Sequence, residues 1–331
     1  MTNGIDPEEA RNFLDSQDRE FGVNTFEEVE KEPVKVTSLG KAQSHIQMEE
    51  LSAASESPWK LLDLATLPSS GLFYPEGAEL LLRSAKTKEI RHWSTIDEND
   101  PIDVREKINF ILNSCTKFKV RGVVAPLNFN DFLEVDRYHI LFRIYELTFP
   151  NQENKLWAYI KCENAQCGHT NQTQVTSKNL LGFKYPEELM KWYSPTEKCF
   201  VVPSEKLGET LRFHLPTIGM SARFRQKRKD EQQKGMESDD SFYAHGPYLV
   251  KDWRKIDLQQ LSDLKMHSLD WSENKFVVIH KFTELLEKAK INKAASVCEK
   301  CKTQTESHIF LGGSFTVKDI FIISAGLDEL I

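Results

Sequence analysis

Two stretches, YIKCENAQCGHTNQ at residues 159–172 and SVCEKCKTQTE at residues 296–306, each place two cysteines where the pattern predicts a tight turn beside a strand. The first couple is Cys162 and Cys167, and the second is Cys298 and Cys301. Two such turns supply the four thiolates that a tetrahedral structural zinc ion binds. We therefore expect one zinc ion to join the two turns and to close residues 168–297 into an excursion whose ends are tied together.

The spacing within each couple is typical of metal-binding turns. Two residues separate Cys298 from Cys301, and four separate Cys162 from Cys167, within the range of about two to four found in zinc sites. Gly168 follows the first couple, where the turn needs a positive φ angle. Unrelated surface cysteines and a redox Cys-x-x-Cys pair are the alternatives, although no βαβ pattern surrounds the second couple. Four sulfur ligands favour a structural site, because a catalytic zinc keeps one position for water.

The amino-acid composition limits the classes of protein to which this chain can belong. The 331 residues include 43 Lys and Arg against 50 Asp and Glu, a formal net charge of −7. This balance disfavours nonspecific binding to a nucleic-acid backbone. The start, MTNGIDPEEA, has no apolar core and predicts no secretory signal, and no apolar run approaches the ~18 residues of a membrane helix. Six cysteines without an export signal indicate a reducing compartment, where closely spaced cysteines are more often metal ligands than disulfides.

The patterning predicts an α+β protein in three parts. Residues 1–57 are rich in Glu, Asp, Ser and Gln and bury too little apolar surface to fold alone, so we expect a disordered acidic arm. Residues 58–150 are expected to form a β-hairpin followed by a pair of helices. Residues 151–331 are expected to form a zinc-ribbon-like β module, with a large, mainly helical insertion at about residues 180–295 between its two turns.

Apolar periodicity places the individual elements. In the second part, helical spacing predicts helices over residues 102–118 and 130–149. Strands are expected on either side of the first cysteine couple. The insertion is predicted to contain, in chain order, a short helix at 184–193, strands at 199–203 and 210–216, and helices at 217–240, 252–269 and 272–291. The stretch DIFIISAGL at 319–327 is expected to be a buried strand or helix.

The sequence contains no motif of an enzyme that we can identify. Nucleotide-binding glycine loops, a zinc-protease helix and a nucleophile elbow are all absent from it, so we expect neither catalysis nor a small-molecule substrate. One basic run contains Arg223, Arg225, Lys227 and Arg228. It could meet phosphates or an acidic protein face, or it could be the solvated side of a helix, since acidic residues follow at once. No aromatic ladder of the kind that binds single-stranded nucleic acid accompanies it.

The stretch LPSSGLFYPEG at residues 67–77 carries a further signal. It follows a Leu-Pro-Ser-x-Gly-x-x-Tyr-Pro signature, with Leu67, Pro68, Ser69, Gly71, Tyr74 and Pro75. Together with the strand, the helix pair and the cysteine couple with its glycine that come after it, this stretch resembles the T-even-type bacteriophage baseplate hub family over about residues 60–185. The acidic arm and the long insertion between the cysteine turns depart from that family's pattern.

The resemblance implies a structural or assembly protein of a contractile phage tail, which helps to form the baseplate hub. Such a protein would act in the host cytoplasm during assembly or in the tail baseplate of the virion, with other baseplate or tail proteins as partners and no membrane. Phe73, Tyr74 and Trp93 would be apolar anchors for those partners, or Phe73 and Tyr74 would form a turn packed on its own helices. A tail assembly chaperone that binds the tape-measure protein, and a zinc-ribbon protein that binds nucleic acid, are the alternative functions.

Overall fold

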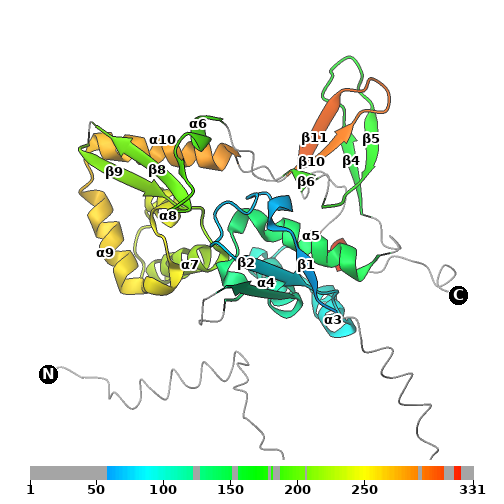
Figure 1. Cartoon of the computed structure of the whole chain (residues 1–331), viewed down its shortest axis with the longest axis horizontal. Coiled ribbons are helices and arrows are strands. Elements are labelled where there is room, and N and C mark those ends of the chain that lie inside the picture. The colour runs from blue at the N-terminus through cyan, green and yellow to red at the C-terminus, as the bar shows by residue number, and fades with distance from the viewer. Residues whose placement is uncertain are drawn as a thin grey trace, which may run out of the picture. The chain divides into compact units, whose positions relative to one another are not determined.

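The computed structural model describes residues 58–121, 127–150, 156–177, 180–181, 187–205, 207–289, 293–308 and 317–321 (Figure 1). The predicted acidic arm, residues 1–57, lies outside them, as does most of the predicted element at 319–327. Within the described part the chain is mixed, with helices and small antiparallel sheets, which confirms the expected α+β class. None of its helices combines the length and the apolar character needed to cross a membrane.

The N-terminal part is a three-stranded antiparallel sheet with helices, and its elements are β1 (Lys60–Leu62), η1 (Leu64–Thr66), β2 (Ala78–Leu82), α3 (Thr87–Ser94), α4 (Pro101–Cys115), β3 (Thr116–Val120), η2 (Phe129–Asp131), η3 (Glu134–Asp136) and α5 (Arg137–Thr148). The strand order is β1-β2-β3. Asp100 caps α4 and Pro101 begins it, as the sequence predicts. β3 was not predicted separately, because the expected helix was extended to residue 118.

The predicted helix at 130–149 is correct only from Arg137 onward. The residues before it form two 3-10 turns, because their backbone groups bond to a distant segment. Glu134 N–H donates to the carbonyl of Pro216 (2.9 Å), and the carbonyl of Phe132 accepts from Ile218 N–H (2.8 Å). Tertiary hydrogen bonds have therefore replaced the helical ones.

The cysteine module consists of a two-stranded ribbon and a three-stranded sheet. Its strands are β4 (Trp157–Lys161), β5 (Thr170–Gln174), β6 (Leu180–Leu181), β10 (Lys293–Val297) and β11 (Gln304–His308). β4 pairs with β5, and the second sheet has the order β11-β10-β6, all antiparallel. Leu180 pairs with Ala294 and Leu181 with Lys293, so the two ends of the insertion lie next to each other. The structure therefore brings the two ends of the predicted excursion together.

The insertion contains a second small sheet and a set of helices. Its elements are α6 (Glu187–Met190), β7 (Tyr193–Ser194), β8 (Cys199–Ser204), β9 (Glu209–Phe213), α7 (Ile218–Gln233), α8 (Asp240–Leu249), η4 (Trp253–Lys255), α9 (Leu258–Leu269) and α10 (Glu273–Ala289), followed at the C-terminal side of the chain by η5 (Lys318–Phe321). α8 was missed, because it contains a proline and follows a polar run. The other predicted helices and strands are present with shifted ends.

The hydrophobic core runs across the boundary expected at residue 150. The ring of Phe73 packs on Tyr193 and Phe200 of the insertion, with centroids 5.1 and 5.2 Å apart. Trp253 Nε1 donates to Asp131 Oδ1 (3.0 Å), which joins the insertion to η2. One cluster of buried side chains includes described residues from both sides of residue 150, so that residue does not separate two cores.

Candidate metal centre

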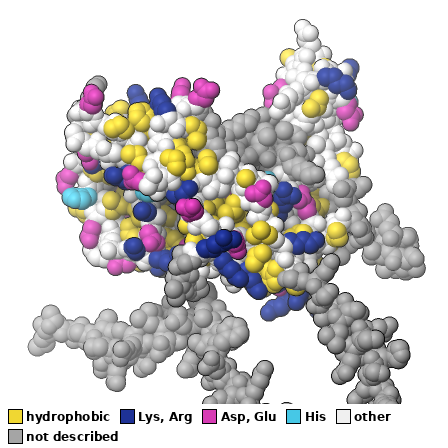
Figure 2. Space-filling view, viewed as in Figure 1, with side chains coloured by type: hydrophobic (Ala, Val, Ile, Leu, Met, Phe, Trp, Pro, Cys, Tyr) yellow, Lys and Arg dark blue, Asp and Glu magenta, His cyan; other side chains and the backbone are white. Residues whose placement is uncertain are grey.

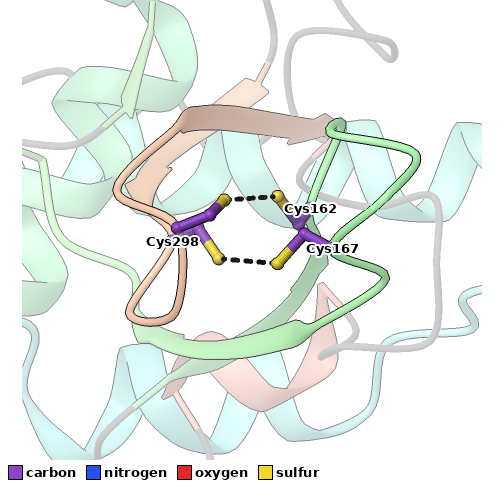
Figure 3. A group of neighbouring side chains, drawn as sticks. Cys162, Cys167 and Cys298 are labelled. Carbon is purple, nitrogen blue, oxygen red and sulfur yellow. Dashed lines mark hydrogen bonds between the residues drawn. The ribbon is translucent and has the colours of Figure 1, made fainter.

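The four cysteines predicted as ligands meet at one end of the β module. Cys162 Sγ lies 3.5 Å from Cys301 Sγ, and Cys167 Sγ lies 3.8 Å from Cys298 Sγ. All four sulfur atoms lie within 4.8 Å of one another, although the couples are more than 130 residues apart (131 and 139 for these two pairs). Figure 3 shows the thiols pointing toward one another from facing turns. The cluster could therefore hold a metal ion.

The first turn is built by backbone hydrogen bonds at the end of the β4–β5 ribbon. Cys162 N–H donates to the carbonyl of His169 (2.8 Å), and Cys167 N–H donates to the carbonyl of Asn164 (2.9 Å). Gly168 has a φ of 59°, which glycine adopts without the penalty of a Cβ atom. The predicted positive φ at Gly168 is confirmed.

The second turn repeats this arrangement with a different residue. Cys298 N–H donates to the carbonyl of Thr303 (2.9 Å), and Lys302 N–H donates to the carbonyl of Cys298 (2.9 Å). Lys302 has a φ of 63° and follows the second cysteine of its couple, as Gly168 follows Cys167. In both turns, the residue after the second cysteine therefore has a positive φ. The sequence does not indicate this for the second turn, because a lysine in this conformation is strained and a glycine is not.

The surroundings of the sulfur atoms favour the thiolate form of the second couple, Cys298 and Cys301. Hydrogen bonds with the side chain and the backbone of Thr303 lower the pKa of Cys301 to about 6. Backbone N–H groups, that of Cys301 first, also lower the pKa of Cys298. Burial raises the pKa of Cys162 to about 12. Without a cation the four thiols cannot all lose their protons, and a bound cation would favour the thiolate form of each.

Two polar pairs join the halves of the module, and sequence reasoning did not single them out. Buried Asn171 donates from Nδ2 to the carbonyl of Ile160 (3.3 Å) and accepts from Glu299 N–H at Oδ1 (3.0 Å). Thr173 Oγ1 donates to Ser296 Oγ (2.6 Å). Asn171 and Thr173 lie on the same strand face as the buried Val175. This spacing of two residues is the one sequence signal that could have marked their side chains as inward-facing.

The remaining two cysteines lie in the core, as their apolar neighbours predict. Cys115 on α4 and Cys199 on β8 are fully buried, and burial raises the pKa of Cys115 to about 12. Neither belongs to the cluster of four.

The three aromatic residues predicted as partner anchors are core residues, and this prediction is corrected here. Phe73 is 8% exposed, Tyr74 3% and Trp93 0%. Trp93 packs edge-on against Phe321 at 5.0 Å, and its Nε1 donates to the carbonyl of Lys318 (3.0 Å). These rings stabilise the chain's own fold, and the alternative of a turn packed internally is the correct one for Phe73 and Tyr74.

The turn at residues 67–75 is organised around one buried carboxylate. Ser69 donates to Asp136 twice, from its backbone N–H (2.8 Å) and from its hydroxyl (2.6 Å). Tyr74 Oη donates to Asp136 Oδ2 (2.9 Å), and Gly71 has a φ of 71°. Burial raises the pKa of Asp136 to about 6, although these hydrogen bonds lower it. The signature residues are thus joined to the start of α5 by a single side chain.

The basic run on α7 is divided between different environments. Lys227 is buried, bonds to Ser262 Oγ (2.6 Å) and pairs with Glu231 (3.4 Å). Arg228 pairs with Asp240 (2.6 Å) on α8. Arg223 and Arg225 are half-buried. Lys227 therefore lies neither on a solvated face nor on a binding patch, whereas the two alternatives stay open for Arg223, Arg225 and Arg228. In Figure 2, basic and acidic side chains lie side by side over much of the visible face.

No protein-family model, curated protein or solved structure gave a significant match to this chain.

Proposed function

We propose that the four cysteines hold one zinc ion whose role is structural. In an ideal tetrahedron with zinc–sulfur bonds of about 2.3 Å, neighbouring sulfurs lie about 3.8 Å apart. The Sγ separations of 3.5 and 3.8 Å fit this geometry. All four positions would be taken by thiolates of this chain, so none is left for a water or a substrate. The ion would supply a link between the two turns and no chemistry.

The metal link would add to one short strand pairing and two polar pairs that hold the ends of the loop together. β6 contributes only Leu180 and Leu181 to its pairing with β10. A zinc ion bound to both turns would hold the flanks of the insertion in register, since metal binding and folding are coupled. A fixed insertion with several helices suits a protein that presents surfaces to partners.

We further propose that this protein is a non-enzymatic structural or assembly component of a contractile phage tail, acting at the baseplate hub. The observation that carries this proposal is the turn at residues 67–75. Its Ser69 and Tyr74 both bind Asp136, and Gly71 supplies the positive φ. The residues that carry the resemblance to the hub family form one folded turn, and this supports the proposal.

Removal of the gene from a phage that encodes this chain tests the role. We expect tails without complete baseplates, and rescue by the wild-type gene and by a Cys199→Ala control but not by a Cys298→Ser, Cys301→Ser double variant. Complete baseplates in the absence of the gene would contradict the proposal. Mass spectrometry of purified particles then separates a hub component, which is retained in the virion, from an assembly chaperone, which is not.

A further inference from the structure

Two histidines from different helices face each other where α8 packs on α10. The Nε2 atom of His245 on α8 lies 3.2 Å from the Nδ1 atom of His280 on α10. The ring centroids are 5.1 Å apart, and the ring planes lie at 86° to each other. His245 is buried and His280 is exposed, so the pair is open to solvent on one side. Neither residue belongs to the cysteine cluster.

The buried Thr283, about one turn after His280 on α10, orients the inner ring. Its hydroxyl donates to the main-chain carbonyl of Ile279 (2.8 Å), so the same oxygen accepts from the Nδ1–H of His245 (2.6 Å). The Nε2 atom of His245 then carries no proton, and its lone pair is directed toward His280. A hydrogen bond at the other ring nitrogen holds most metal-binding histidines in this way.

The separation of the two rings is that of a pair of ligands on one metal ion. With nitrogen–metal bonds of about 2.1 Å and an angle of about 100° at the metal, the nitrogens lie about 3.2 Å apart and the ring centroids about 5.0 Å apart. The observed distances are 3.2 and 5.1 Å. A straight N–H···N hydrogen bond of this length would separate the centroids by about 5.5 Å. The arrangement therefore fits a chelate better than a straight hydrogen bond.

The surroundings of His245 keep its ring neutral and place negative charge near it. Burial, followed by the charge of His280, lowers the pKa of His245, and the carboxylates of Asp239 and Glu287 oppose this shift. The imidazole is therefore neutral at about pH 7, which is the form that binds metals. The two carboxylates would offset part of the charge of a bound cation.

We propose that His245 Nε2 and His280 Nδ1 together bind a divalent zinc ion. Imidazole nitrogen is a preferred ligand of zinc. The ion would take the place of the proton between the rings, and His280 would change through solvent from its Nδ1–H to its Nε2–H tautomer, so no other reactant is consumed. Two protein ligands leave positions on the ion for water, in contrast to the closed cysteine site. Such an ion exchanges readily, so protein purified without added zinc would keep only the cysteine-bound ion.

Zinc binding by the full-length protein without an affinity tag tests the inference. The probe is Zn²⁺, and equilibrium dialysis at a series of free zinc concentrations, followed by elemental analysis, counts the ions bound per chain. At intermediate concentrations we expect the wild type to hold about one ion more than His280→Gln, because one imidazole binds zinc at least about tenfold more weakly than two. Equal zinc content in both proteins would overturn the proposal and leave the pair as a hydrogen bond only.

His267→Gln is the matched control, because His267 is also an exposed histidine on a helix of the insertion. This variant should bind as much zinc as the wild type. A loss as large as that of His280→Gln would overturn the proposal, because zinc would then be held by surface histidines in general.

Thr283 provides a second test that leaves both ligands in place. Thr283→Val removes the acceptor of the His245 Nδ1–H at nearly constant volume, whereas Thr283→Ser keeps a hydroxyl. We expect zinc affinity at the pair to fall about tenfold or more in Thr283→Val and to stay near that of the wild type in Thr283→Ser. Unchanged affinity in Thr283→Val would overturn the proposed arrangement of the site.

The comparison does not depend on the proposed function. Circular dichroism shows whether each variant is folded, and the exposed position of His280 makes its replacement the least disruptive one. If the four cysteines held no zinc, the count would fall equally in the wild type and His280→Gln, so their difference reports on the histidine pair alone. Complete baseplates in the absence of the gene would remove the tail role and leave this site untouched.

Discussion

Asn171 Oδ1 accepts a 3.0 Å hydrogen bond from the backbone N–H of Glu299, the residue that directly follows Cys298. The buried Asn171 side chain lies on the strand that follows the first metal-binding turn. Its hydrogen bond thus fixes the position of the second turn. This relationship explains how two turns of unequal length bring four sulfur atoms together.

Replacing Asn171 should loosen the metal centre without removing a ligand. In Asn171→Ala the N–H of Glu299 loses its partner, and we expect a loss of about 1 to 3 kcal/mol in unfolding free energy. Release of the metal to a chromogenic chelator should be faster than in the wild type. Gln172→Ala, at the exposed neighbouring position on β5, is the matched control and should behave as the wild type. Equal release rates for both variants would show that Asn171 has no part in holding the turn.

Removing the metal should destabilise the protein through the module. We expect elemental analysis of purified protein to find one zinc ion per chain, and a strong chelator to lower the melting temperature by on the order of 10 °C. Cys301→Ser should lose the metal, because a tetrahedral site needs four strong ligands. Cys199→Ala, which alters a buried cysteine outside the cluster, should keep it. A metal-free protein with an unchanged melting temperature would contradict the structural role.

The buried Asp136 should make the protein less stable as the pH rises. Its pKa is raised from 3.8 to about 6, so the folded state binds the proton more tightly than the unfolded state. Stability from this group is therefore fully present below about pH 4 and is lost as the pH rises to about 6, with a total change of about 3 kcal/mol. Denaturant unfolding of the wild type and Asp136→Asn across this range gives the difference between them. A difference independent of pH would contradict the assignment.

His139 should have the opposite effect in an overlapping pH range. It is buried on α5, neither ring nitrogen has a hydrogen-bond partner in the described residues, and burial followed by the charge of Arg143 lowers its pKa from 6.5 to about 4. The unfolded state then binds the proton more tightly, so stability is lost as the pH falls from about 6.5 to about 4. We expect the wild type to lose about 3 kcal/mol relative to His139→Leu over this interval. Parallel stability curves for the two proteins would refute this.

Local sequence patterns determined much of the architecture. Spacing and turn residues were sufficient to identify the four cysteines, the strands beside them and the positive φ of Gly168. Apolar periodicity located most helices. Each helix buries one face, so its apolar residues recur with the helical period. The α+β class followed from these elements. In all these cases the deciding interactions lie within a few residues of one another along the chain.

Tertiary structure alone decided the rest, because contacts between distant residues leave no local pattern. Residues 129–136 leave the helical form because their backbone groups bond to residues 216–218. Phe73 and Trp93 resemble surface anchors in the sequence, yet aromatic rings from distant segments cover them. Lys227 lies in a basic run of the sequence, yet it is buried because α9 packs on α7. The burial of a side chain and its charged partners depend on which distant segments come into contact. A local sequence pattern does not indicate which segments these are.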